Sequence, residues 1–266
     1  MAEKTRVVVV GALGRMGMET VKAIEQDEEL ELVAAVDIKA KGESISEITG
    51  IKGSSIIIHN DLETALEETK PQVLVDFTNP QAVFNNIRTA LVRGVTSVVG
   101  TTGLNQVELN QLEKLALEHD VGVAVIPNFA IGAVLMMKFA QEAAKYFPDV
   151  EIIEIHHDKK MDAPSGTAIK TAELISQNRP QRPPRNVMEM EKITGCRGGN
   201  MDQIRIHSVR LPGFVAHQEV IFGGIGQSLT IRHDSYDRVG FMPGVLMVIK
   251  RMLNRKGLVY GMENLL

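Results

Sequence analysis

The sequence contains a single cysteine, Cys196, so the chain cannot form an internal disulfide. This absence is compatible with a reducing compartment, and we expect a cytoplasmic protein. No run approaches the ~20 apolar residues that span a bilayer, and the first residues lack the apolar segment of a secretory signal. The formal net charge of −4 shows no basic excess, which nucleic-acid-binding domains usually carry. Neither nucleic acid nor a membrane is therefore expected as a partner.

The first half of the sequence alternates short β-branched runs with longer amphipathic stretches. This pattern is typical of βαβ units around a parallel sheet, and it predicts a doubly wound, Rossmann-type fold. Six strands are expected, at residues 7–10, 32–36, 55–58, 73–76, 97–99 and 121–126. Helices are expected near residues 16–27, 61–68, 80–93 and 106–119.

The pattern changes near Asn128, which indicates a second, α+β part. A long apolar helix, a strand and a second helix are expected first, at residues 131–147, 150–155 and 167–177. An exposed loop over 179–202 and three strands joined by short turns follow, at residues 203–211, 215–222 and 227–232. Consecutive strands with short turns predict an antiparallel meander. A final helix over 239–253 and a short apolar tail complete the chain.

The overall prediction is an α/β protein with two domains. Residues 1–129 form a dinucleotide-binding domain, and residues 130–238 form an α+β domain with a mainly antiparallel open sheet. Residues 239–266 are expected to return and pack on the first domain.

Three glycines lie where the first strand turns into the first helix, in Gly11-Ala12-Leu13-Gly14-Arg15-Met16-Gly17. Their spacing is G-x-x-G-x-x-G, whereas the usual dinucleotide fingerprint is G-x-G-x-x-G, so the motif alone also fits an ordinary strand-to-helix turn. In the fingerprint, Gly11 would make the tight turn, Gly14 would admit a pyrophosphate and Gly17 would let the helix approach the strand.

Asp37 supports a cofactor site, because it ends the second strand about 20 residues beyond the turn, where an acid binds the adenosine ribose. An acid there repels a 2′-phosphate and favours NADH, but Lys39, Lys41 and Arg15 are close in sequence. We expect NADH to be used and NADPH to be tolerated. Gly100–Thr102 and Asn128-Phe129 follow later strands, where they either flank the nicotinamide or form ordinary turns.

The densest group of reactive side chains is the segment from His156 to Thr167, which follows an expected strand. It holds two histidines and two lysines, and Pro164-Ser165-Gly166-Thr167 then opens a helix whose free N–H groups favour an anion. A proton donor, a positive charge and an anion site thus lie in one short stretch. With Asp158 and Asp162 the histidines also suggest a metal, but adjacent ligands on a strand diverge, so no metal is expected.

Three segments together resemble the 4-hydroxy-tetrahydrodipicolinate reductase family, formerly called dihydrodipicolinate reductase. They are the turn 11–17, the stretch Gly100-Thr101-Thr102-Gly103, and residues 156–167. The last segment is the most specific, because its histidine pair, lysine and Pro-Ser-Gly-Thr belong to the family in that order and spacing. The resemblance covers the whole chain.

The resemblance implies a reductive step of lysine and diaminopimelate biosynthesis, in which NADH or NADPH reduces C4 of a cyclic imine dicarboxylate after loss of water. It implies that His156 is the general acid, that Lys160 is the catalytic lysine, and that the second domain assembles a homotetramer. It further implies substrate contacts from His157, Ser165, Gly166 and Thr167. The implied cofactor contacts are Gly11, Ala12, Leu13, Gly14, Arg15, Met16, Asp37, Gly100, Thr101, Thr102, Ile126, Pro127, Asn128 and Phe129.

Two departures from the family pattern affect cofactor contacts. Leu13 stands where glycine or alanine is common, and Ile126 stands where a small residue is usual. Both residues would shift the cofactor slightly, and neither removes a chemical group.

Two other functions compete with this interpretation. Another two-domain amino-acid dehydrogenase, such as a semialdehyde dehydrogenase, would need a cysteine nucleophile at a strand–helix junction, but Cys196 lies in an expected loop. A regulator that senses NADH without turnover would not need the acid–base groups at 156–167.

Overall fold

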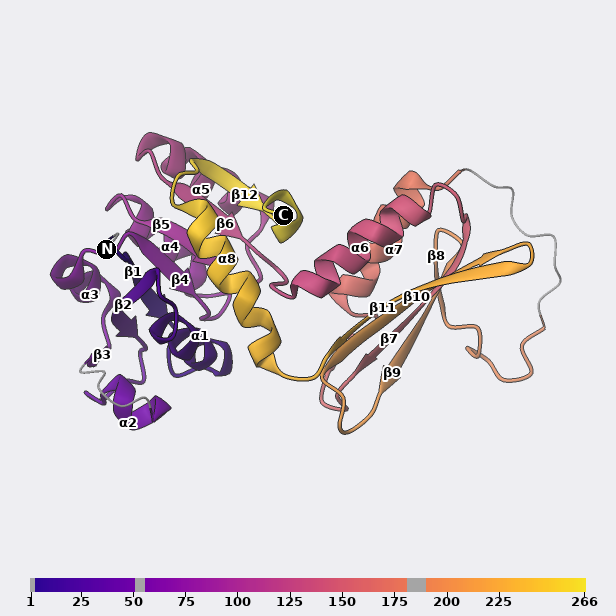
Figure 1. Ribbon diagram of the computed structural model, residues 1–266, viewed down its shortest axis with the longest axis horizontal. Helices are drawn as coiled ribbons and strands as arrows, with labels where there is room; N and C mark the ends of the chain where they lie inside the picture. Colours follow the sequence, from indigo (N-terminus) through magenta and orange to yellow (C-terminus); the bar gives the residue numbers. More distant parts are fainter. Residues whose placement is uncertain (1–2, 51–55, 181–189) are drawn as a thin grey trace. The chain divides into compact units, whose positions relative to one another are not determined.

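The structure is a computed structural model that describes residues 3–50, 56–180 and 190–266. The chain divides into two compact units, shown in Figure 1. Unit 1 comprises residues 1–129 together with 241–266, and unit 2 comprises residues 130–240. The last helix and strand of the chain therefore belong to the same unit as the N-terminal sheet.

Unit 1 is built on a seven-stranded sheet in which every neighbouring pair is parallel. Its strands, in spatial order, are β12 (Gly257–Tyr260), β6 (Gly122–Val125), β5 (Thr96–Val99), β4 (Val73–Asp76), β1 (Thr5–Val10), β2 (Leu30–Val36) and β3 (Ile58–His59). Its helices are α1 (Arg15–Glu25), α2 (Ile45–Thr49), α3 (Leu62–Thr69), α4 (Val83–Leu91), α5 (Gln106–Glu118) and α8 (Met242–Met252), with a 3₁₀ turn η2 (Met262–Asn264) near the end.

The sheet of unit 1 is covered on both faces. Val8 and Val10 of β1 belong to a buried cluster with Leu66 of α3 and Ala90 of α4. The alternate residues of β1 are also fully buried, and α1 and α8, which contact each other, cover that side. A strand buried on both faces needs an unbroken apolar sequence, which is why the run 7–10 predicts it. The predicted doubly wound parallel sheet is confirmed.

Three details of unit 1 differ from the sequence prediction. The C-terminal tail forms a seventh strand, β12, which pairs with β6, because its short apolar run completes the edge of the sheet. Helix α2 was not predicted, although Ser44 and Glu47 form a capping box at its start. Of the strand expected over 55–58, Ser55 lies outside the described residues, and β3 contains only Ile58 and His59.

The described residues of unit 2 form a mixed five-stranded sheet and two helices. Its strands, in spatial order, are β11 (Gln227–Ser235), β10 (Ala216–Gly224), β7 (Asp149–His156), β9 (Ile204–Arg210) and β8 (Gly199–Met201). The helices are α6 (Ile131–Ala143) and α7 (Gly166–Asn178), and a 3₁₀ turn, η1 (Arg238–Phe241), follows β11. Three of the four strand pairs are antiparallel, so the prediction of a mainly antiparallel sheet is confirmed.

The predicted meander of three consecutive strands is wrong, because β7 lies between β9 and β10. Strands β7 and β9 are joined through α7 and pair in parallel, as a helical crossover allows. Only β10 and β11 form the expected hairpin. The short link between β9 and β10 crosses one intervening strand, a distance of about 10 Å that a few residues span.

The loop predicted over 179–202 also contains a strand. Residues 181–189 lie outside the described residues, but Gly199–Met201 form β8 and pair with β9. Asp202 and Gln203 connect the two strands with φ angles of 50° and 63°, which fits a tight two-residue hairpin turn.

Helices α6 and α7 cover one face of the sheet in unit 2 and leave the other face open (Figure 1). Burial along β7 alternates accordingly: Val150, Ile152 and Glu154 are buried, whereas Ile153 and Ile155 are partly exposed. Glu154 therefore points to the helix-covered face, and its neighbours in sequence point to the open face.

Gly17 sets the distance between α1 and the turn that precedes it. A Cβ atom at this position would collide with the carbonyl oxygen of Gly11. Because the obstacle is backbone, the helix would have to move away from β1, and the apolar contacts of α1 would loosen.

We predict that Gly17→Ala lowers the free energy of unfolding by about 2 kcal/mol, measured by urea denaturation. Gly240→Ala is the matched control, since nothing lies within 4 Å of a Cβ at that position. Equal stabilities of the two variants would contradict the close approach of α1.

Candidate active site

The residues expected to bind a dinucleotide follow the carboxyl ends of four parallel strands of unit 1. Gly11 follows β1, Asp37 follows β2, Gly100 follows β5 and Ile126 follows β6. Because the strands are parallel, these ends meet at one edge of the sheet, where open α/β sheets bind their ligands.

Backbone hydrogen bonds inside the protein hold the glycine turn. The N–H groups of Gly11 and Ala12 donate to the carbonyl oxygen of Val36 at 2.8 and 3.1 Å, and Gly14 N–H donates to Gly11 at 2.9 Å. Gly11 has a φ of +80°, and a Cβ there would lie 2.5 Å from the carbonyl oxygen of Phe77. Only glycine fits this position, as the sequence predicts.

The start of α1 is the part of the turn that suits an anion. Gly14 is the N-cap residue, and no side chain caps the helix. The first-turn N–H groups, including those of Arg15 and Met16, have no partner within a helix. They therefore offer hydrogen bonds and the positive end of the helix dipole to a pyrophosphate.

Asp37 is fixed by the backbone that surrounds it. Its Oδ2 accepts a hydrogen bond from Leu13 N–H at 3.0 Å, and its Oδ1 accepts one from Lys39 N–H at 3.0 Å. Each carboxylate oxygen has a second lone pair, so the side chain still has acceptor capacity for a ribose hydroxyl. Asp37 thus supports the glycine turn and keeps acceptor capacity for a ligand.

A buried carboxylate that sequence reasoning missed holds the segment after β5. Asp76, at the end of β4, is fully buried, and its Oδ1 accepts the hydroxyls of Thr78 and Thr101 at 2.7 and 2.6 Å. Its Oδ2 accepts the side-chain amide of Asn86 at 2.9 Å. The hydroxyl of Thr101 is therefore already engaged, whereas Thr102 is exposed. An acid at the end of an apolar strand was the available signal for Asp76.

The segment after β6, residues 126–129, lies partly in the hydrophobic core. Ile126 and Phe129 are buried, and the ring of Phe129 packs against that of Phe77 with centroids 5.6 Å apart. Pro127 is exposed and Asn128 is half-buried. A ligand at this edge would therefore meet Ile126 through its backbone.

In unit 2 the predicted proton donor is paired with a carboxylate that was not predicted. His156 is the last residue of β7, and its Nδ1 lies 2.5 Å from Oε2 of Glu154, two residues earlier on the same face of the strand. The Glu154 side chain is fully buried and that of His156 is 15% exposed, so solvent reaches only the histidine.

Arg210, at the end of β9, binds the same carboxylate with both guanidinium nitrogens. Its two NH groups donate to Oε2 and Oε1 of Glu154 at 2.9 and 2.7 Å. Ser165 N–H approaches Oε1 at 3.3 Å. Burial by itself raises the pKa of Glu154, but hydrogen bonds from His156, Arg210 and Ser208 outweigh it and bring the pKa to about 2. Glu154 is therefore a carboxylate at any working pH.

The loop after β7 carries the predicted lysine. Lys160 Nζ lies 2.7 and 2.8 Å from the two oxygens of Asp162, and this hydrogen bond lowers the pKa of Asp162. Arg210 also reaches the loop, since it donates to the Asp162 carbonyl oxygen at 2.7 Å. Lys159 is exposed, as expected of a solvated charge.

The start of α7 differs in detail from the anion site that the sequence suggests. Ser165 is the N-cap residue: its hydroxyl accepts a hydrogen bond from Ala168 N–H at 3.2 Å, and the residue is buried. The polar groups of Ser165 thus already have protein partners. Gly166 is exposed, with nothing within 4 Å of a Cβ position, so a ligand has room there.

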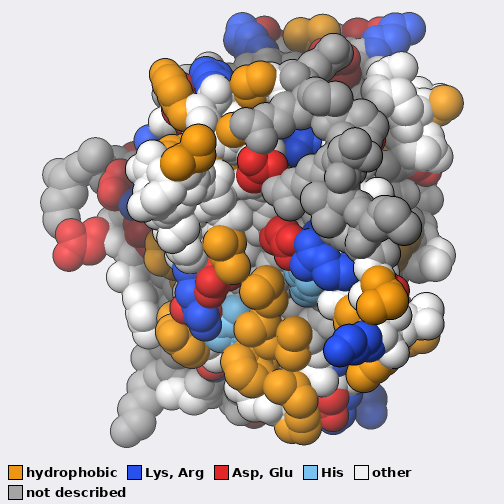
Figure 2. Space-filling model, turned by 90° about the vertical axis from the view of Figure 1, so that its right-hand side faces the viewer, with side chains coloured by type: hydrophobic (Ala, Val, Ile, Leu, Met, Phe, Trp, Pro, Cys, Tyr) orange, Lys and Arg blue, Asp and Glu red, His pale blue; other side chains and the backbone are white. Residues whose placement is uncertain are grey.

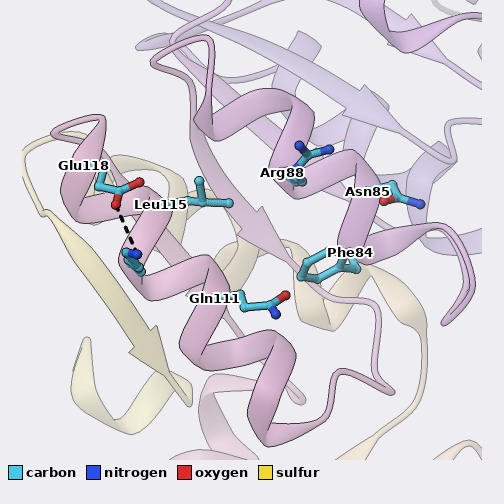
Figure 3. A pocket seen from close by; sticks show the side chains of 7 residues that line it. Phe84, Asn85, Arg88, Gln111, Leu115 and Glu118 are labelled. Atoms are coloured by element: carbon cyan, nitrogen blue, oxygen red, sulfur yellow. Dashed lines mark ion pairs between the residues drawn. The ribbon is translucent and has the colours of Figure 1, made fainter.

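Other features of the described residues lie apart from these groups. No helix in that part of the chain is long and apolar enough to cross a membrane, and no three potential metal-ligating side chains cluster there. A surface pocket lies between α4 and α5, lined by Phe84, Asn85, Arg88, Gln111, Lys114, Leu115 and Glu118 (Figure 3). None of the predicted site residues lines this pocket.

Comparison with known proteins places both halves of the chain in one family. Residues 5–129 match the family model described as dihydrodipicolinate reductase, N-terminus, and residues 132–266 match the one described as dihydrodipicolinate reductase, C-terminus. The chain is 73% identical to a 4-hydroxy-tetrahydrodipicolinate reductase of Syntrophomonas wolfei, over 100% of both chains. It is 53% identical to one of Bacillus cereus, over 99% of each.

A solved structure agrees with these sequence matches. Dipicolinate-bound dihydrodipicolinate reductase from Paenisporosarcina sp. TG-14 superposes with a TM-score of 0.89 at 48% identity, covering 99% of this chain and 100% of that one. With its glycine turn in unit 1 and its His156 site in unit 2, the chain belongs to the dihydrodipicolinate reductase family.

Proposed function

We propose that this protein reduces 4-hydroxy-tetrahydrodipicolinate to tetrahydrodipicolinate, with loss of water, at the expense of NADH or NADPH. The reaction belongs to lysine and diaminopimelate biosynthesis. The main support is the 73% identity to a reductase of that name over the full chain. The alternatives of a sensor without turnover and of a cysteine-dependent dehydrogenase lose their basis, because Cys196 is exposed in a loop and the family is one of reductases.

The residues of unit 1 fit a nicotinamide dinucleotide. The uncapped start of α1 would hold the pyrophosphate, and Gly14, without a side chain, lets it approach. Asp37 would accept a hydrogen bond from the ribose, while Gly100, Thr102 and Asn128 would border the nicotinamide. When bound, the reduced cofactor supplies the hydride that reaches C4 of the substrate ring.

The residues of unit 2 would supply the proton and the charge. Reduction of an unsaturated imine leaves an enamine that must be protonated on carbon, and His156 would donate that proton. Lys160 would stabilise negative charge on the substrate, and His157, Gly166 and Thr167 would bind its carboxylates. Ser165 would help indirectly, by capping the helix that presents Gly166 and Thr167.

We predict that His156→Gln and Lys160→Ala each lower kcat by about 10²-fold, because proton donation and charge stabilisation contribute on that scale. The measurement is oxidation of NADH and NADPH with the substrate generated in place. Lys159→Ala is the control, since Lys159 is a neighbouring exposed lysine. Near-normal turnover of both site variants would refute these roles.

The second prediction concerns the choice of cofactor. Asp37→Ala removes the acid that binds the ribose and repels a 2′-phosphate, so kcat/KM for NADH should fall relative to that for NADPH. The ratio is the proper readout, because losing the hydrogen bond from Leu13 N–H would loosen the turn for both cofactors. An unchanged ratio would rule out the ribose contact.

We also propose that unit 2 forms the interface of a homotetramer. The open face of its sheet carries partly exposed apolar side chains on adjacent strands, Ile153 and Ile155 on β7 and Ile221 on β10. On the face of the molecule in Figure 2, hydrophobic side chains gather beside histidines and charged groups. Exposed apolar surface of this kind marks a contact with another protein surface.

The cytoplasmic location of the protein remains a prediction.

Ile221→Lys should convert the tetramer to smaller species in sedimentation equilibrium, because a buried, unpaired charge at an interface is costly. Val107→Lys is the control, since Val107 is exposed on α5 of unit 1. A wild-type chain that sediments as a monomer would disprove the assembly.

A further inference from the structure

Glu154 and its partners are not explained by the proposed roles of His156 and Lys160 alone. A fully buried carboxylate is costly to desolvate, so its place beside the predicted proton donor needs a reason. Three partners of Glu154 come from three different elements of unit 2. His156 belongs to β7, Arg210 to β9 and Ser165 to the start of α7.

The charge of Glu154 determines which ring nitrogen of His156 carries a proton. A carboxylate only accepts hydrogen bonds, so Nδ1 of His156, 2.5 Å away, must be the donor. In the neutral ring the proton therefore lies on Nδ1, and Nε2 is left for the substrate. With a pKa of about 2, Glu154 does not take this proton itself.

The groups around Glu154 and His156 keep Glu154 charged and His156 hydrogen-bonded to it. Arg210 supplies a partly buried positive charge from β9, in a bidentate geometry that also fixes the plane of the carboxylate. From β10, the residue in register with Glu154 is the neutral Gln218. Helix α7 contributes the N–H of its N-cap residue, Ser165, to Glu154. The nearby Lys160, in the loop after β7, is paired with Asp162.

We propose that Glu154 is a positioning residue of the reductase: it fixes the ring and the tautomer of His156, so that Nε2 delivers the proton to the substrate carbon. The inference rests on the proposed function. In the charged ring both nitrogens carry protons. The Nε2–H bond breaks as the new C–H bond forms. The neutral ring that remains keeps its proton on Nδ1, which still donates a hydrogen bond to Glu154.

The first test compares two glutamates of the same strand. Glu154→Gln keeps the shape and removes the charge. Glu151→Gln is the matched control, because Glu151 on the opposite face also binds an arginine and a histidine, Arg197 at 2.6 Å and His207 at 2.8 Å. Glu154→Gln should lower kcat by about 10²-fold with little change in KM for NADH, whereas Glu151→Gln should stay within about threefold of wild type.

The pH profile separates positioning from mere structural support. Without the carboxylate the charged form of His156 loses its counter-ion, so the basic limb of kcat/KM should move to lower pH in Glu154→Gln. Glu154→Asp restores the charge and should move the limb back toward wild type. A Glu154→Gln enzyme with kcat within about threefold of wild type and an unmoved limb would overturn the proposal.

A measurement on the wild-type protein decides the matter even if Glu154→Gln does not fold. Nitrogen-15 NMR of histidine-labelled protein reports which ring nitrogen is protonated, and loss of a signal in His156→Gln identifies His156. At a pH where the ring is neutral we expect the Nδ1–H tautomer, and an Nε2–H tautomer would refute the inference. If His156→Gln itself retains full activity, the proposed function of His156 fails instead, which distinguishes the two failures.

Discussion

The buried carboxylate of Glu154 is the interaction on which the candidate site of unit 2 depends. Because burial penalises a charge, a buried carboxylate persists only with hydrogen-bond donors around it. Here the donors come from β7, from β9 and from the N-cap residue of α7. Satisfying one carboxylate thus brings together a strand end, a neighbouring strand and a helix start. Arg210 extends the network to the loop, through the carbonyl oxygen of Asp162. Because this network holds the backbone, the exposed residues at the strand end and the helix start keep their positions.

Unit 1 uses acids in a similar way at the ends of its strands. Asp76 holds Thr78, Asn86 and Thr101, and Asp37 holds the backbone of the glycine turn and of Lys39. In each case a carboxylate accepts hydrogen bonds from N–H or hydroxyl groups of loops, and Asp76 also accepts one from a helix side chain; without the carboxylates these groups would need water. The loops themselves can therefore be short and rich in glycine and threonine, and they leave backbone groups for a dinucleotide at the edge of the sheet.

The sequence predicts the parts of this structure that depend on local pattern. The continuous apolar run 7–10 identifies a strand buried on both faces, and the three glycines of the first turn identify a close approach that the collision of a Cβ at Gly17 explains. Contacts that depend on the order of the strands in the sheet cannot be predicted from local sequence pattern. Arg210 reaches Glu154 only because β9 pairs with β7, a pairing that the expected meander did not specify. Glu154 was within reach of local reasoning, since residues two apart on a strand share a face.

The two cations of the unit 2 site differ in how readily they exchange partners. Arg210 and Glu154 form a bidentate pair whose carboxylate is fully buried. Removing the arginine would leave that buried charge uncompensated, at a cost of about 3–5 kcal/mol. Lys160 is paired with Asp162, whose side chain is 63% exposed, and an ion pair this accessible contributes at most about 1 kcal/mol. An anionic ligand would therefore displace Asp162 from Lys160 at little cost, while Arg210 would stay in place. Under the proposed function, Arg210 maintains the geometry of the proton donor and Lys160 is the cation that responds to substrate.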